Sequence, residues 1–121
     1  VNMNFAMREA LRLLAEEGLE NSWVRHRINS EKLWEGLEKI GLKLLVKQEL
    51  RLPTLTTVCI PEGIDGKAFS LHLLNNHGIE IGGGLGDLAG KVWRIGLMGY
   101  NSTAENVDLI LNIFETELPR F

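Results

Sequence analysis

The first third of the chain carries apolar residues at the spacing of an α-helix. Between residues 3 and 40 they recur every three or four positions, with charged side chains on the opposite side. Gly18 interrupts this run. A second helical pattern starts at about Leu19 and ends at Gly41, a residue type that commonly follows the last turn of a helix. We therefore predict two consecutive helices that form a long arm over residues 1–40.

The spacing of apolar residues changes after this arm. Residues 42–46 and 55–60 are rich in strand-forming side chains and are separated by a Leu-Pro-Thr turn, so both are predicted to be strands. Two further strands are predicted at residues 79–81 and 91–97, on either side of a glycine-rich loop.

Two more helices complete the pattern. Asp65 can cap a helix that ends near Gly78. Ser102-Thr103-Ala104-Glu105 has the form of a capping box, with serine at the cap, and opens the last helix. This order of elements predicts an α+β fold of two layers, in which a small, mostly antiparallel sheet has helices on one face. The long helical arm precedes this small domain, which is predicted to span residues 41–121.

The composition narrows the range of functions. Of the 121 residues, 45% are apolar and 24% are charged, which favours a packed core over intrinsic disorder. A net charge of −3 gives no electrostatic basis for binding nucleic acid or an anionic membrane. Cys59 is the single cysteine, so no intrachain disulfide can form, as in a reducing intracellular compartment. The first residue, Val1, is not a methionine, which suggests a chain cut from a longer one.

The glycine loop at residues 82–86 fits neither common phosphate-binding motif. A P-loop needs a glycine five residues before Gly90-Lys91, but that residue is Leu85. The dinucleotide-binding pattern Gly-x-Gly-x-x-Gly also fails, because three residues and not two separate Gly86 from Gly90. Both motifs also lead into a helix, whereas this loop leads into a predicted strand. The loop is therefore a tight chain reversal or a place where a ligand or neighbouring backbone approaches closely.

Arg94 is the strongest single candidate for function. In residues 92–97 the side chains alternate between two faces, so that Trp93, Ile95 and Leu97 share an apolar face and Arg94 lies on the other face. Its planar guanidinium matches the shape and charge of a carboxylate. An ordinary solvated or ion-paired arginine is the alternative interpretation.

Other chemistry-bearing residues carry weaker signals. Lys91 is a candidate for a Schiff base because it lies beside the glycine loop, but nothing in the sequence indicates a desolvated pocket around it. His72 and His77 are five residues apart, which does not place them on one helix face as metal ligands, and no metal site is predicted. Cys59 is predicted to be a small buried thiol within a strand.

Several segments, taken together, resemble the alanine–glyoxylate (serine–pyruvate) aminotransferases, which are class V, fold-type I enzymes dependent on pyridoxal phosphate. The resemblance runs from Val1 to about Leu118 and corresponds to the C-terminal part of those enzymes. The segments that carry it are Arg8–Leu11, Ala15–Trp23, Arg51–Thr54, Ile79–Gly86 and Arg94–Gly99.

The resemblance implies specific roles. Arg94 falls on the family arginine that binds the substrate carboxylate, and Gly83 and Gly84 fall at the mouth of the active site. It implies amino-acid and 2-oxo-acid substrates, with an amino group moving from alanine or serine to glyoxylate or pyruvate, as in glyoxylate detoxification. Pyridoxal phosphate is implied for the parent enzyme, with its Schiff-base lysine upstream of Val1 and no catalytic or cofactor-binding residue in this chain.

The resemblance further implies a homodimeric parent in the peroxisome or mitochondrion. By itself the chain is expected to be inactive and to self-associate through the apolar surface that its neighbouring domain would cover. The alternative hypothesis is a free-standing α+β module that binds a small molecule or another protein.

Overall fold

A three-stranded antiparallel sheet forms one layer of the computed structural model, which describes residues 1–121. The strand order is β1-β3-β2, with β3 paired to both neighbours. In chain order the helices and strands are α1 (Asn2–Glu17), α2 (Leu19–Lys39), β1 (Leu55–Cys59), α3 (Gly66–His77), β2 (Gly82–Gly83), β3 (Val92–Gly96) and α4 (Ala104–Glu117). None of the helices is long and apolar enough to cross a membrane.

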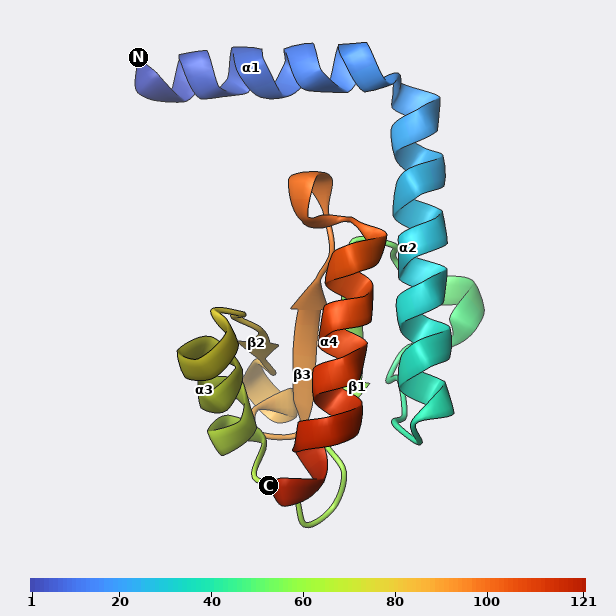
Figure 1. The fold of residues 1–121 in the computed structure, drawn as a ribbon, viewed down its shortest axis with the longest axis vertical. Coiled ribbons are helices and arrows are strands. Elements are labelled where there is room, and N and C mark those ends of the chain that lie inside the picture. The colour runs from blue at the N-terminus through green and yellow to red at the C-terminus, as the bar shows by residue number, and fades with distance from the viewer.

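Helices cover one face of the sheet and make the second layer. Figure 1 shows α4 in front of the sheet, between α3 and α2. Trp93 of β3 lies at the centre of the core, with its ring 5.5 Å from those of Phe69 of α3 and Phe114 of α4. The predicted apolar face of this strand is confirmed, since Trp93, Ile95 and Leu97 are all buried. The α+β prediction with helices on one face is therefore also confirmed.

The predicted break at Gly18 separates two helices with different surroundings. Gly18 has φ of +90°, a left-handed conformation that glycine adopts at little cost. Helix α2 contributes Leu33, Trp34 and Leu37 to the core, whereas α1 buries none of its residues. Figure 1 shows α1 extending away from the rest of the chain after a sharp bend.

Arg25 holds this bend. Its Nε and Nη2 atoms donate to the Glu17 carboxylate at 2.5 and 3.1 Å, and its Nη1 atom donates to the carbonyl oxygens of Gly99 and Ser102 at 2.8 and 2.7 Å. The guanidinium therefore joins the end of α1 to the loop that precedes α4. The hydrogen bond from Arg25 lowers the pKa of Glu17.

The prediction of a strand at residues 42–46 is wrong. Only Leu44 forms a bridge, to Val58 of β1, and two backbone hydrogen bonds accompany it. Leu42 and Leu44 are buried, but Leu45 and Val46 are exposed and the chain turns away. This segment is held by the burial of alternate leucines rather than by a continuous ladder of hydrogen bonds.

The prediction of a strand at residues 79–81 is also wrong, because β2 lies in the glycine loop itself. The Ile79 amide is bonded to the Leu73 carbonyl and closes the end of α3, so it is not available to a sheet. Ladder pairing starts only at Gly82, opposite Arg94, and continues at Gly83, opposite Trp93.

One of the two predicted caps is correct, and the other is displaced by one residue. The Asp65 carboxylate caps α3 by accepting a hydrogen bond from the Ala68 amide at 3.0 Å. Thr103, and not Ser102, caps α4 by accepting from the Asn106 amide at 3.1 Å. Ser102 is fully buried, and its hydroxyl and carbonyl oxygens accept from the Asn29 amide of α2, so this serine joins two elements instead.

The Glu17–Arg25 pair makes a prediction about pH. Because the pKa of Glu17 is lower in the folded chain than its ordinary value near 4.5, the pair stabilises the fold above that value, and the stabilisation is lost as the pH falls below it. We expect Glu17→Gln to lower the thermal unfolding midpoint at neutral pH and to reduce its fall on acidification. Glu31→Gln, at an exposed residue without an ion pair, is the control. Parallel pH profiles for wild type and Glu17→Gln would contradict this role.

Candidate functional site

Arg94 lies in the middle of the central strand. It is paired with Thr57 of β1 on one side and with Gly82 of β2 on the other. The neighbouring residues Trp93 and Ile95 point into the core, so alternation places the Arg94 side chain on the sheet face away from the helices. The structure therefore agrees with the sequence-based placement of this arginine.

One hydrogen bond holds the guanidinium of Arg94. Its Nε atom donates to the Gly83 carbonyl oxygen at 2.7 Å, and the side chain makes no other hydrogen bond within the chain. It also forms no ion pair with a carboxylate, since the ion pairs of the chain all involve other residues. The two terminal nitrogens are thus left available to an anion of suitable geometry.

The three consecutive glycines contribute in different ways. A Cβ atom on Gly82 would lie 3.3 Å from Arg94 Nη2, so this glycine makes room for the guanidinium. A Cβ atom on Gly84 would lie 2.0 Å from the Leu88 carbonyl oxygen, which no rotation of a side chain could relieve. A Cβ atom on Gly83 would meet nothing within 4 Å, so Gly83 contributes its carbonyl group. The interpretation of the loop as a close backbone approach is confirmed at Gly84.

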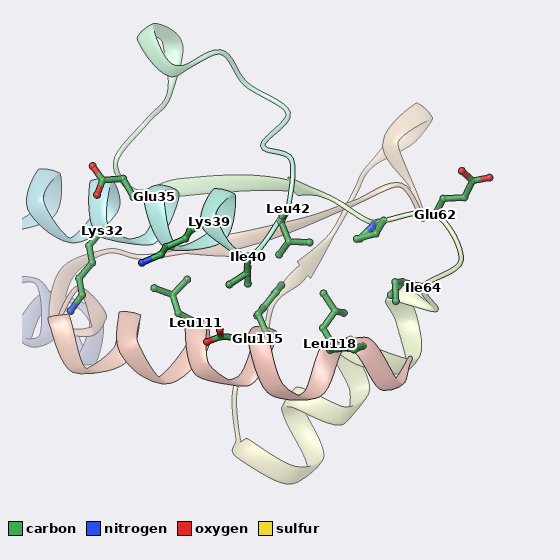
Figure 2. Close-up of a pocket in the computed structure, with 15 residues that line it drawn as sticks. Lys32, Glu35, Lys39, Ile40, Leu42, Glu62, Ile64, Leu111, Glu115 and Leu118 are labelled. Atoms are coloured by element: carbon green, nitrogen blue, oxygen red, sulfur yellow. The ribbon is translucent and has the colours of Figure 1, made fainter.

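A large groove lies elsewhere in the chain. It is a groove of about 830 Å³ between α2, α4 and the segment around residue 62. Figure 2 shows its apolar floor, with Ile40, Leu42, Leu111 and Leu118, and charged side chains at the rim. Arg94 is not among its lining residues. The half-buried Arg94, on the sheet face away from the helices, is therefore separate from this groove.

Lys91 and Cys59 show no sign of activation. Lys91 is exposed in the turn just before β3. Cys59 ends β1 and is half-buried, so it is less buried than predicted. Neither side chain hydrogen-bonds to a histidine.

The structure places His72 and His77 together, contrary to the inference from their five-residue spacing, and adds Glu117 to them. His72 and His77 of α3 both contact Glu117, the last residue of α4, through their Nε2 atoms at 2.5 and 2.9 Å. The hydrogen bonds from the two histidines lower the pKa of Glu117, and the bond from His72 has the larger effect. Glu117 is 40 residues from His77, so no local spacing could have indicated the cluster.

The chain is similar to known aminotransferases along most of its length. It is 53% identical to the alanine–glyoxylate aminotransferase of Callithrix jacchus over 107 residues, which are 88% of this chain. It is 45% identical to the (S)-ureidoglycine–glyoxylate transaminase of Bacillus subtilis over 118 residues, or 98% of this chain. The crystal structure of the alanine–glyoxylate aminotransferase from Nostoc sp. matches 95% of the chain with a TM-score of 0.91 and 63% identity.

The chain is homologous to a C-terminal fragment of class V aminotransferases. It covers 26% of the Callithrix jacchus protein, 28% of the Bacillus subtilis protein and 30% of the Nostoc structure, and the matched part is a C-terminal fragment. Thus it spans less than a third of these aminotransferases. No model of a protein family matches the chain.

The two glycines of the loop make a matched prediction. Because a methyl group on Gly84 would overlap the Leu88 carbonyl, Gly84→Ala should displace the loop and destabilise the chain by about 1–3 kcal/mol. Gly83→Ala is the control and should change stability by less than about 0.5 kcal/mol, since its Cβ would occupy open space. Urea unfolding of both variants measures the difference. Equal stabilities would show that the close approach at Gly84 is not a constraint.

Proposed function

We propose that this chain is the small domain of a pyridoxal-phosphate-dependent aminotransferase and that Arg94 binds the carboxylate of its substrates. The substrate classes are amino acids and 2-oxo acids, with alanine or serine as amino donor and glyoxylate or pyruvate as acceptor. The names of the similar proteins support a glyoxylate-using transaminase. A homodimeric parent in the peroxisome or mitochondrion, acting in glyoxylate detoxification, belongs to the same proposal.

The observation that carries this proposal is the state of the Arg94 guanidinium. Its Nε atom is occupied by the Gly83 carbonyl, so a carboxylate must approach the two terminal nitrogens. That end-on approach allows two parallel hydrogen bonds, which orient the carboxylate as well as holding it. An oriented carboxylate fixes the direction of the substrate Cα bonds, and this positioning lowers the barrier of a reaction at Cα.

The electrostatic surroundings support binding of an anion. No carboxylate of the chain pairs with Arg94, so its positive charge is not neutralised locally. Arg94 is half-buried, and the chain spans less than a third of its relatives. In the proposed enzyme the remaining part would cover Arg94, and exclusion of water would strengthen its attraction for a carboxylate.

The chain alone does not fit covalent attachment of the cofactor. When bound, pyridoxal phosphate supplies an electron sink for reactions at Cα. A Schiff-base lysine needs a desolvated amine with a lowered pKa, but none of the lysines in this chain is buried. The proposed contribution of this chain is therefore recognition of the substrate, and the lysine is expected in the remaining part of the enzyme.

Arg94→Lys tests the role of the arginine in the longer enzyme that contains this chain. Lysine keeps the charge but loses the planar pair of donors, so we expect the KM for alanine and glyoxylate to rise about 10- to 100-fold. Arg120→Lys, at an exposed arginine without an ion pair, is the control and should leave both KM values unchanged. Wild-type kinetics for Arg94→Lys would overturn the assignment.

Cofactor binding to the chain alone tests the second part of the proposal. With equimolar pyridoxal phosphate we expect no saturable Schiff-base absorbance, and borohydride should trap no adduct at Lys91. Lys91→Arg should behave as the wild type does. A saturable band that disappears in Lys91→Arg would place cofactor binding within this chain and contradict the proposal.

A further inference from the structure

Two histidines and one glutamate converge where α3 and α4 end. One ligand atom from each of His72, His77 and Glu117 lies within 4.8 Å of the others. The Oε2 atom of Glu117 contacts both Nε2 atoms, and it forms no ion pair with a lysine or arginine. The two imidazoles are thus the only basic side chains that pair with the Glu117 carboxylate.

Packing orients the first imidazole. The His72 ring lies 5.0 Å from that of Phe121, 6.5 Å from that of Phe69 and 5.6 Å from that of His77. Its Nδ1 atom lies 2.6 Å from the Asn76 side-chain amide. An amide can present either its nitrogen or its oxygen after a flip. With its oxygen turned toward His72, Asn76 accepts a hydrogen bond from Nδ1–H, and the Nε2 lone pair is free to bind a metal.

The local charge favours a cation. His77 and Glu117 are each the last residue of their helix, where the helix dipole places partial negative charge. The three side chains are 19–25% exposed, so an ion could reach them and keep water in a remaining position. A neutral imidazole and a carboxylate are the forms of these side chains that coordinate a metal.

We propose that His72, His77 and Glu117 form a site for a divalent transition metal, with Zn²⁺ as the probe ion. Two imidazole nitrogens and one carboxylate oxygen are the donor set of open tetrahedral zinc sites, in which water takes the fourth position. Zinc bonds of about 2.0–2.1 Å place neighbouring ligand atoms roughly 3.3 Å apart. Small side-chain rotations convert the observed hydrogen-bonded cluster into that arrangement. This site is independent of the proposed role of Arg94.

Metal titration of the purified chain tests the site. We expect Zn²⁺ to bind saturably at one ion per chain in calorimetry and to raise the thermal unfolding midpoint. Co²⁺ should give the intense visible absorption of a tetrahedral nitrogen–oxygen site, without a thiolate band from Cys59. Mg²⁺, which prefers oxygen ligands in octahedral geometry, should not bind.

Substitutions test whether these three side chains, and not others in the chain, bind Zn²⁺. His77→Gln and Glu117→Gln should each abolish saturable binding, and the glutamine at residue 117 can still hydrogen-bond to both rings, which keeps the fold. Asn76→Ala should weaken binding on the order of 10- to 100-fold through loss of its contact with His72. His26→Gln removes the one histidine outside the cluster and should bind as the wild type does.

Several results would overturn the site. These are the absence of saturable Zn²⁺ binding to the wild type, retention of binding in His77→Gln and Glu117→Gln, and loss of binding in His26→Gln or Cys59→Ser. In the first case the cluster is an ion-paired contact between α3 and α4 only.

Discussion

The alternation of side chains along β3 is the constraint on which the rest of the structure depends. As the central strand it pairs on both edges, and Trp93 is the residue around which α3 and α4 pack. A slip of one residue in register would put Arg94 into that core and Trp93 into water. Because burying an unpaired guanidinium is very costly, the aromatic packing itself enforces where the arginine points.

Local signals in the sequence predicted the helices, the Gly18 break and the Asp65 cap, because each depends on residues close together in the chain. The two wrong strands are short segments whose pairing depends on distant partners. At residues 79–81, the hydrogen bond from the Ile79 amide to the Leu73 carbonyl prevents strand pairing. The residue types in this segment do not predict that hydrogen bond. Arg94 was predictable since period-two alternation is local. The convergence of His72 and His77 on Glu117 was not, because it depends on how α3 and α4 are packed.

Arg25 and Arg94 show two uses of the same side chain. The guanidinium nitrogens of Arg25 all donate hydrogen bonds within the chain, to one carboxylate and two carbonyl groups. Arg94 uses one donor and has no anionic partner. Under the proposed function, the unpaired terminal nitrogens of Arg94 are the donors that would bind the substrate carboxylate.

The exposure of α1 has a consequence for cooperativity. This helix buries no residue, and within its 16 residues the pairs of Arg12 with Glu9 and Glu16 are its main side-chain support. Exposed ion pairs of this kind contribute little, and isolated helices of this length are marginal in water. The amides of α1 should therefore exchange with solvent much faster than those of β3. The part of α1 that precedes the Glu17–Arg25 pair is then the less stable part of the chain.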